Sequence, residues 1–363
     1  MKKIINDKET IVKEMIRGIV LSNKELDYDP KYNFIYKKDL NINKVLLITG
    51  GGSGHEPFAA GYIGKGMLDC AVCGNIFASP SQIQVYKSIK KLEELHKKKQ
   101  KEENKNLPIN ILLLILNYSG DILNFTNAME MAKEEGININ YIKIDDDIAV
   151  NNSLYTVGKR GVAGMVLLCK IIGAASEKLY DLEKLTNLGK NVVSNIFSIG
   201  FALKSCTVPA NGAPTFLLEK DEIEYGIGIH SEPGIKKEKL LSANELSIKM
   251  CNDILKNVEL KNEDEILILV NGFGGTPLME LYILNENIIK YLSDKCKIMD
   301  DMVGNYMTSI DMEGASLTIF KIYNNEVKEF LEDEVYTLGL KQKKIKLEKV
   351  IPKTNDEKII NID

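Results

Sequence analysis

A run of glycines after a short apolar segment restricts the possible folds of this chain more than any other feature. Val45 to Ile48 form an apolar segment typical of a buried strand, and the sequence GGGSG follows at positions 50–54. Glycines at this density let the backbone turn tightly and let a ligand approach its N–H groups. In an open α/β sheet, ligands bind just beyond the carboxyl end of such a strand. His55 comes next, and because a simple phosphate-binding loop needs no imidazole, we expect further chemistry at this loop.

Apolar segments alternate with amphipathic segments along the rest of the chain. This alternation is typical of an α/β protein, and 363 residues are enough for two domains. We place the boundary near 190–205, which gives an N-terminal α/β domain over 1–195 with the glycine loop, a C-terminal α/β domain over 196–340 and a tail over 341–363. Strands are predicted over 45–48, 68–72, 109–115, 138–144, 266–270 and 317–320, and helices over 8–21, 123–133, 158–175, 182–204 and 278–292.

The overall composition argues against several classes of protein. The net charge is −4, whereas a nucleic-acid-binding protein is expected to carry a basic domain. No apolar run approaches the roughly 20 residues that span a membrane, and the N-terminal segment lacks the apolar core of roughly 7–15 residues found in signal peptides. We therefore expect a cytoplasmic protein that contacts neither a membrane nor nucleic acid directly.

Three local patterns each allow two interpretations. Cys70 and Cys73 form a CxxC pair, but no second pair or suitably spaced histidines follow, so we favour buried thiols in a reducing compartment over a zinc or redox site. The lysine- and glutamate-rich stretch 87–108 fits a solvated helix end and surface loop better than a docking site for an acidic partner. The acidic triplet at 145–147 could ligate Mg²⁺, but we favour a role in steadying a loop or capping a helix.

The chain contains three histidines, and two of them occur in glycine-rich settings. His55 follows GGGSG and His230 follows GIGI, each with a glutamate and a proline close behind, whereas His96 lies in the charged stretch and is expected to face solvent. Asp121 supplies a carboxylate just after the predicted strand 109–115. Imidazoles act as acids, bases or nucleophiles near neutral pH, so these groups suit a small polar substrate with hydroxyls or a carbonyl. The sequence contains neither GxxxxGK[ST] nor a complete dinucleotide fingerprint.

Five longer motifs follow one another along the chain. They are GGGSGHEP at 50–57, NYSGDILNF at 117–125, DDDIAV with SLYTVGKRGVAG at 145–164, SIGFALKSCTVP at 198–209 and GIGIHSEPG at 226–234. Together they resemble the dihydroxyacetone kinase K subunit family, over a stretch from Lys2 to about Asp333. The resemblance implies two α/β domains, each a sheet with helices packed on it, usually in a homodimer, and dihydroxyacetone as the substrate.

The same resemblance implies roles for individual residues. His230 corresponds to the histidine that adds to the substrate carbonyl and holds it as a covalent hemiaminal. His55 and Asp121 correspond to the pair that binds the substrate hydroxyls and moves the proton when a hydroxyl attacks phosphorus. Gly52, Ser53 and Gly54 correspond to the substrate-binding loop.

The resemblance also implies a partner. No metal or nucleotide site is expected on this chain, since no fused ATP-binding part is recognisable in its sequence. ADP or ATP with Mg²⁺ is expected on a separate nucleotide-binding L subunit. The sequence leaves open whether a phosphotransferase-system protein or ATP supplies the phosphate.

Two departures from the family pattern support an alternative. Leu116 occupies the position where the family usually has a lysine before its Asn-Tyr-x-Gly-Asp motif, and a cation there would help to neutralise phosphoryl charge. The chain also has no tryptophan, although a tryptophan-bearing C-terminal segment is common in the family. Some K-like paralogues bind dihydroxyacetone as non-catalytic co-activators of a transcription regulator, and this is the alternative function. A kinase for a related short ketose such as erythrulose remains a third possibility.

Overall fold

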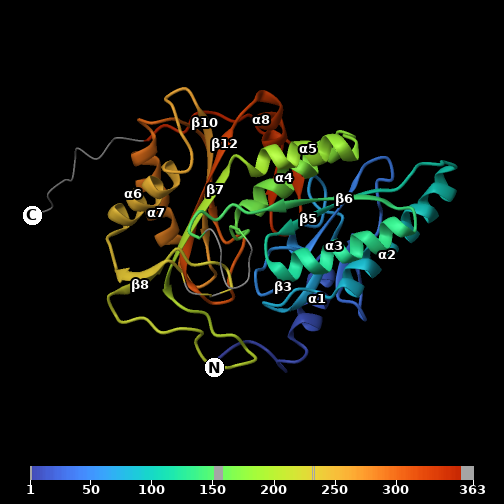
Figure 1. The fold of residues 1–363 in the computed structure, drawn as a ribbon, viewed down its shortest axis with the longest axis horizontal. Coiled ribbons are helices and arrows are strands. Elements are labelled where there is room, and N and C mark those ends of the chain that lie inside the picture. Colours follow the sequence, from blue (N-terminus) through green and yellow to red (C-terminus); the bar gives the residue numbers. More distant parts are fainter. Residues whose placement is uncertain (1, 151–157, 231, 233, 353–363) are drawn as a thin grey trace, which may run out of the picture.

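Two mixed six-stranded sheets carry the fold (Figure 1). The computed structural model describes residues 2–150, 158–230, 232 and 234–352, so residues 153–157 of the third motif and positions 231 and 233 of the fifth lie outside the described residues. The first sheet has the order β1-β2-β4-β3-β5-β6, made of β1 (Leu26–Asp29), β2 (Phe34–Lys37), β3 (Leu46–Ser53), β4 (Cys70–Ile76), β5 (Asn110–Leu116) and β6 (Asn138–Ile144). The second has the order β11-β10-β12-β7-β8-β9, made of β7 (Ile196–Lys204), β8 (Glu222–Tyr225), β9 (Lys236–Lys239), β10 (Glu265–Gly272), β11 (Lys297–Gly304) and β12 (Glu313–Ile322).

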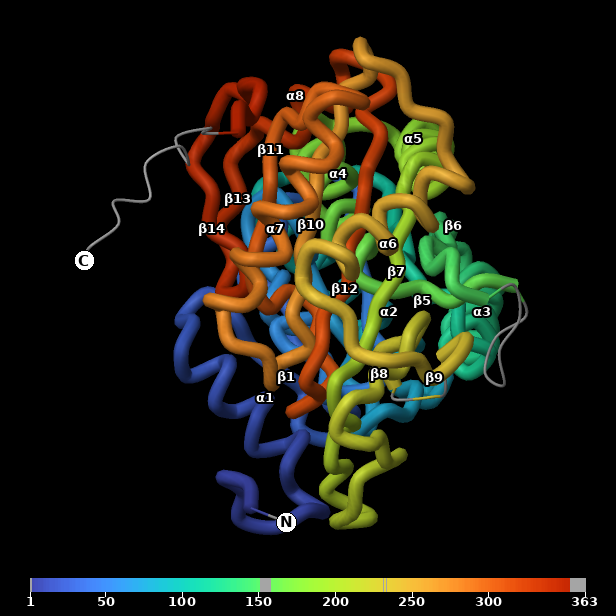
Figure 2. Tube along the Cα trace, turned by 90° about the vertical axis from the view of Figure 1, so that its left-hand side faces the viewer, coloured from blue at the N-terminus to red at the C-terminus, as the bar shows by residue number. Residues whose placement is uncertain are grey.

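Helices cover both sheets and also fill the space between them. On the outer face of the first sheet lie α2 (Gln82–Glu103) and α3 (Ser119–Glu134), and on the outer face of the second lie α6 (Ala243–Leu255) and α7 (Leu278–Leu292), as Figure 2 shows for the latter pair. Between the sheets lie α4 (Gly164–Glu177), α5 (Leu182–Val193) and α8 (Asn325–Glu332), while α1 (Ile11–Ser22) packs near β1 and β4. The α/β class with two helix-covered sheets is therefore confirmed.

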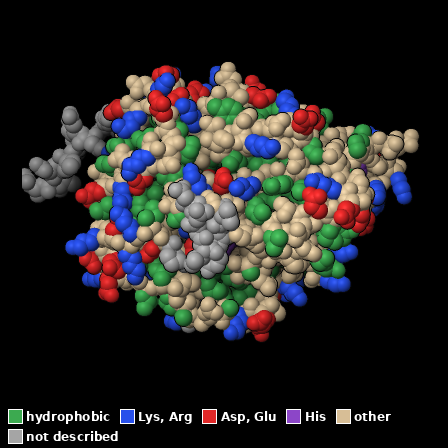
Figure 3. Space-filling view, in the orientation of Figure 1, with side chains coloured by type: hydrophobic (Ala, Val, Ile, Leu, Met, Phe, Trp, Pro, Cys, Tyr) green, Lys and Arg blue, Asp and Glu red, His purple; other side chains and the backbone are tan. Residues whose placement is uncertain are grey.

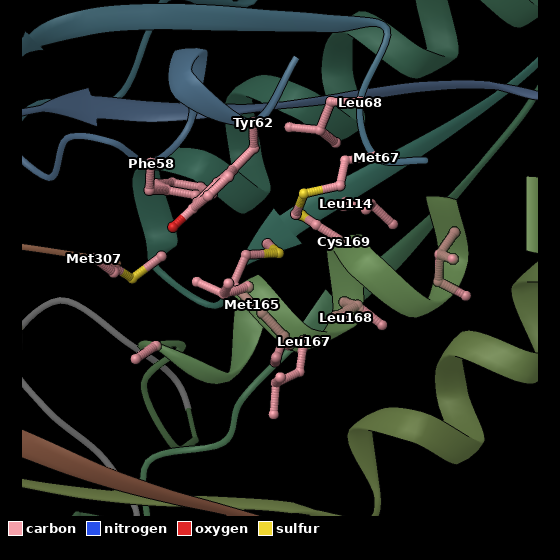
Figure 4. Packing of buried hydrophobic residues seen from close by; sticks show 14 of the residues in the cluster. Phe58, Tyr62, Met67, Leu68, Leu114, Met165, Leu167, Leu168, Cys169 and Met307 are labelled. Atoms are coloured by element: carbon pink, nitrogen blue, oxygen red, sulfur yellow. The ribbon is translucent and has the colours of Figure 1, made fainter. Parts of the chain in front are cut away.

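The central helix α4 explains how the two sheets share one interior. Every residue from Gly164 to Ser176 is buried, as expected for a helix that is apolar around most of its surface, with Lys170 and Ser176 as its buried polar residues. In Figure 4, Met165 and Cys169 of α4 lie near Tyr62 and Met67 from the first half of the chain. One continuous apolar cluster contains side chains of α4 and of both sheets. The first six-stranded sheet is built from strands before residue 196 and the second from strands after residue 195. Because the two sheets share this cluster, the division of the chain into separate domains stays a prediction.

Most predicted elements occur, and one was misassigned. The predicted strand 138–144 and helix 278–292 have the bounds of β6 and α7. The segment 182–204, predicted as one helix, is instead α5 to Val193 followed by β7 from Ile196. No signal in the sequence marks the break, because neither glycine nor proline separates the two elements. The second part forms a strand because β7 pairs with β12 on one side and β8 on the other, in the interior of its sheet.

Two predictions about polar residues and thiols had opposite outcomes. The expectation that His96 faces solvent is wrong: it is 2% exposed, because it continues the buried face of α2 formed by Val85, Ile89 and Leu92. All six cysteines are free and buried, and burial raises the pKa of the Cys73 thiol to about 12. The interpretation of the CxxC pair as buried thiols is therefore confirmed.

Two observations concern the expectation that the protein contacts neither nucleic acid nor a membrane. Figure 3 shows lysine and arginine side chains interspersed with aspartate and glutamate, rather than gathered into a basic patch, on the face drawn. No helix in the described ranges is long and apolar enough to cross a membrane.

Parallel pairing in the first sheet brings three loops together. β3 pairs in parallel with β4 on one side and with β5 on the other, so their carboxyl ends meet at the same edge. The chain turns from β3 to β4 and then crosses over β3 to reach β5, which makes this edge a topological switch point. A crevice is therefore expected beyond Ser53, Ile76 and Leu116.

Candidate active site

A pocket of about 370 Å³ lies at this switch point. The end of β3, the turn after β4 and the first turn of α3 form three of its walls, and the loop after β8 of the second sheet contributes His230. Of the six residues predicted for the site, Gly52, Asp121 and His230 line the pocket. The complete lining is Gly52, Phe77, Ser79, Tyr118, Ser119, Gly120, Asp121 and His230.

The glycine loop is shaped by contacts that exclude side chains. A Cβ atom at Gly52 would lie 2.6 Å from the backbone nitrogen of Ala78, so a side chain here would collide with the turn after β4. Ser53 and Gly54 serve the loop itself: the Ser53 hydroxyl donates to the carbonyl of Gly74 at 2.7 Å, and the Gly54 N–H donates to the Glu56 carboxylate at 3.1 Å. The predicted binding loop therefore presents Gly52 to the pocket, with its two neighbours as supports.

His55 is fixed in one tautomer by the second half of the chain. Its Nδ1 lies 2.8 Å from the carbonyl oxygen of Thr308, in the connection between β11 and β12. A carbonyl only accepts hydrogen bonds, so Nδ1 carries the proton and Nε2 keeps its lone pair. Nε2 is buried and has no hydrogen-bond partner among the described residues. Burial, followed by the neighbouring His230, lowers the pKa of His55 to about 3, so the imidazole is neutral at physiological pH.

Aromatic rings enclose the imidazole of His230. The rings of Tyr118 and His230 meet edge to face with centroids 4.3 Å apart, and those of His55 and His230 are 4.7 Å apart. Phe77 stacks on His55 and meets His230 edge-on at 5.5 Å. The two histidines, which are 175 positions apart in the sequence, thus lie in contact, and His230 also lines the pocket.

A buried arginine that the motif analysis did not single out supports the His230 loop. Arg160 donates to the Asp147 carboxylate at 2.8 Å, to the carbonyl of Gly226 at 2.7 Å and to the Glu232 carboxylate at 3.2 Å. Glu232 in turn accepts the backbone N–H of His230 at 3.1 Å. A signal was available in the sequence, because only Arg17 and Arg160 are arginines in a chain with 47 lysines and arginines.

Asp121 lies in the first turn of α3 with an unusual electrostatic environment. Its side chain is 4% exposed, and Oδ1 has no hydrogen-bond partner among the described residues. Burial raises the pKa of its carboxyl group to about 7, although a hydrogen bond from Ser79 acts in the opposite direction. A carboxyl group with this pKa exchanges a proton readily near neutral pH, which is the property of an acid–base catalyst.

The acidic triplet at 145–147 has structural partners. Asp146 accepts the N–H groups of Val162 and Gly164 at the start of α4, and Asp147 accepts the N–H of Ala149 as well as the Arg160 guanidinium. These contacts confirm the interpretation in which the carboxylates steady loops and a helix start. Within the described ranges, no group of three or more histidine, cysteine, aspartate or glutamate side chains is arranged to hold a metal ion.

Comparison with known proteins agrees with this arrangement. The Dak1 domain model matches residues 17–339. The chain belongs to the Dak1 domain family. One family member, from Lactococcus lactis subsp. lactis and named PTS-dependent dihydroxyacetone kinase, dihydroxyacetone-binding subunit DhaK, is 43% identical over 340 residues, which cover 93% of this chain and 98% of the relative. The resemblance to the dihydroxyacetone kinase K subunit family is therefore confirmed.

A second kind of Dak1 relative has a regulatory name. The DhaKLM operon coactivator DhaQ of the same organism is 34% identical over 332 residues, which cover 91% of this chain and 97% of the relative. A solved structure of a dihydroxyacetone kinase operon co-activator has a TM-score of 0.81 and 33% identity, and covers 90% of this chain and 97% of its own. The family therefore includes both kinase subunits and co-activators on one fold.

Proposed function

We propose that this chain is the dihydroxyacetone-binding subunit of a multi-subunit dihydroxyacetone kinase, in which His230 holds the ketone covalently. The observation that carries the proposal is the placement of a neutral imidazole, His230, and a buried carboxyl group, Asp121, in the walls of one small pocket. The relative with 43% identity, named as such a subunit, supports the substrate.

Capture of the substrate follows from the state of His230. Burial, followed by the charge of Arg160, lowers the pKa of His230 to about 3, so the imidazole has a free lone pair at neutral pH. That lone pair attacks the carbonyl carbon, a C–N bond forms and the C=O π bond breaks. The oxygen takes up one proton and the imidazole releases one, which leaves a neutral hemiaminal. Glycerol has no carbonyl and cannot form this bond, so covalent capture separates the two substrates.

Transfer of the phosphoryl group requires a base for the attacking hydroxyl. Asp121, with a pKa of about 7, is the group suited to accept that proton, whereas His55, whose pKa is about 3, offers its free Nε2 as a hydrogen-bond acceptor. We expect ADP or ATP with Mg²⁺ to be held by a separate L subunit that faces this pocket, and we expect the chain to act as a homodimer in the cytoplasm. The nucleotide supplies the phosphoryl group, while this chain orients the hydroxyl and removes its proton.

Leu116 bears on the alternative function as a co-activator. Its side chain is 2% exposed, belongs to the central apolar cluster and is absent from the pocket lining. Replacement of the usual lysine therefore leaves the groups that would capture and deprotonate the substrate in place. We accordingly favour the kinase, in agreement with the higher identity to the kinase subunit than to the co-activator.

A paired experiment tests the proposal. Native mass spectrometry with dihydroxyacetone is combined with an assay that contains a matching L subunit and its phosphoryl donor. We expect an adduct and turnover for the wild type, no adduct for His230→Ala, and an adduct without turnover for Asp121→Ala. A wild-type adduct without turnover, with an L subunit shown to bind this chain, would favour the co-activator. No wild-type adduct at all would refute covalent capture.

A further inference from the structure

We infer that Arg160 is a positioning residue for His230, which anchors the His230 loop through Glu232 and adds a permanent positive charge to the surroundings of the imidazole. The inference deepens the proposed function, because it concerns the residue that would capture the ketone. Arg160 itself is fully buried and does not line the pocket, so it would act only through its neighbours.

The anchoring role follows from the hydrogen bonds of Glu232. One carboxylate oxygen accepts from the Arg160 guanidinium at 3.2 Å and the other accepts the backbone N–H of His230 at 3.1 Å. Arg160 also donates to the carbonyl of Gly226, so it contacts the loop on both sides of the histidine. A Cβ atom at Gly228 would overlap the Glu232 carboxylate and lie 3.0 Å from the guanidinium, so the loop closes tightly around this ion pair. The position of the imidazole therefore depends on the pair.

Asp147 fixes the other end of the arginine. It binds the guanidinium at 2.7 Å from Nη2 and 2.8 Å from Nε, and its own side chain is 1% exposed. A planar guanidinium held by two carboxylates cannot rotate without breaking several hydrogen bonds. Arg160 thereby connects the segment before α4 to the His230 loop of the other sheet.

The electrostatic role follows from the charges around His230. The titratable groups that face it are His55 after β3, Tyr118 and Asp121 at the start of α3, Arg160 before α4, and Glu232 on its own loop. Among these, Arg160 is the permanent cation, since a guanidinium does not lose its proton in proteins. Burial and then this cation lower the pKa of His230. The imidazole would therefore stay a nucleophile even in mildly acidic solution.

The histidines provide a readout that needs no substrate. The chain has three histidines, so ¹³C- and ¹⁵N-labelled histidine gives three sets of ring signals, which single variants assign. In the wild type, we expect no titration of His230 between pH 5 and pH 8. In Arg160→Gln, loss of the cation should raise the pKa of His230, while burial still holds that pKa below the ordinary value near 6.5, so the His230 signals should titrate at a higher pH than in the wild type. Arg17→Gln, at the exposed arginine of α1, is the matched control and should behave as the wild type.

Adduct formation gives a second readout. With an ordinary pKa near 6.5, the neutral fraction of an imidazole is about fourfold lower at pH 6 than at pH 8. Because burial persists in the variant, the rate of adduct formation by Arg160→Gln should fall between pH 8 and pH 6 by at most that factor, whereas the wild-type rate should not show this fall. A folded Arg160→Gln protein in which the His230 signals follow pH between pH 4 and pH 8 in the same way as in the wild type would overturn the electrostatic role.

Glu232→Gln tests the anchoring role independently, also if Arg160→Gln fails to fold. This variant keeps the cation and its bond to Asp147 but removes one of the two carboxylate oxygens that hold Arg160 and His230. We expect His230 to remain neutral and the adduct to weaken severalfold. Wild-type adduct affinity in Glu232→Gln would overturn the anchoring role. If even the wild type forms no adduct, the proposed function fails, while the histidine titration still decides the electrostatic role of Arg160.

Discussion

Replacement of Asp121 by asparagine should make the protein more stable while it abolishes turnover. The wild-type carboxyl group has its pKa raised from 3.8 to about 7 by burial. Below pH 3.8 both the folded and the unfolded chain bind the proton, so this group has no effect on stability. Between the two values the folded chain keeps the proton and the unfolded chain has released it, so the free energy of unfolding falls as pH rises. Above pH 7 the buried carboxylate is ionised, and the full cost of burying its charge lowers the free energy of unfolding.

The size of the effect follows from this interval. A pKa raised from 3.8 to about 7 lowers the unfolding free energy of the wild type by at most ~4 kcal/mol at pH 8 and by about 1.5 kcal/mol at pH 5. Asparagine has nearly the same shape and no charge, so Asp121→Asn should recover most of this energy. The difference between variant and wild type should therefore grow from pH 5 to pH 8 and then stay constant.

Urea unfolding of both proteins at pH 5 and pH 8 measures this difference. Asp145→Asn is the matched control, because Asp145 is partly exposed and pairs with Lys143 at 3.3 Å, and surface substitutions usually change stability by less than about 0.5 kcal/mol. An Asp121→Asn variant no more stable than the wild type at pH 8, or a difference that does not depend on pH, would refute the reasoning about the buried carboxyl group.

Three further outcomes are expected. Lys44→Met should cost up to about 3–5 kcal/mol of unfolding free energy, because it removes the nearer of the two cations that pair with the buried Asp69 carboxylate and leaves only Lys37 at 3.4 Å, whereas Lys98→Met at the surface should be nearly neutral in the same urea assay. Gly50→Ala should unfold or strongly destabilise the chain, since its Cβ would overlap the backbone of β4, while Gly18→Ala in α1 meets nothing within 4 Å and should stabilise by about 0.5–1 kcal/mol. Wild-type turnover should rise between pH 6 and pH 8 as Asp121 loses its proton near pH 7, and a flat profile with transfer as the slow step would argue against this base.

Local patterns predicted the parts of the site that depend on one strand and its loop. The apolar segments before Gly50 and Asn117 gave β3 and β5, and the switch-point rule placed their loops at one edge. The helical period also contained a signal that was overlooked: His96 repeats the spacing of the buried positions Val85, Ile89 and Leu92, so it belongs to the inner face of α2. Charged neighbours on the outer face concealed this.

Contacts between segments that are distant in the sequence could not be predicted from local sequence patterns. The pKa of Asp121 depends on burial by several elements, and the tautomer of His55 depends on a carbonyl 253 positions away. The ion pairs of Arg160 join residues 13 and 72 positions apart, so no spacing rule predicts them. The motif resemblance indicated that His230 belongs to the site, but only the structure shows what surrounds it.

The most direct test of the central claim is the detection of the bond between His230 and the substrate. Protein with ¹⁵N-labelled histidine rings is mixed with dihydroxyacetone labelled with ¹³C at its carbonyl carbon, and one-bond ¹³C–¹⁵N coupling is recorded. Covalent capture predicts this coupling in the wild type and its loss in His230→Ala. Saturating binding of the ketone without any coupling, or coupling that persists in His230→Ala, would contradict the assignment of His230 as the residue that holds the substrate.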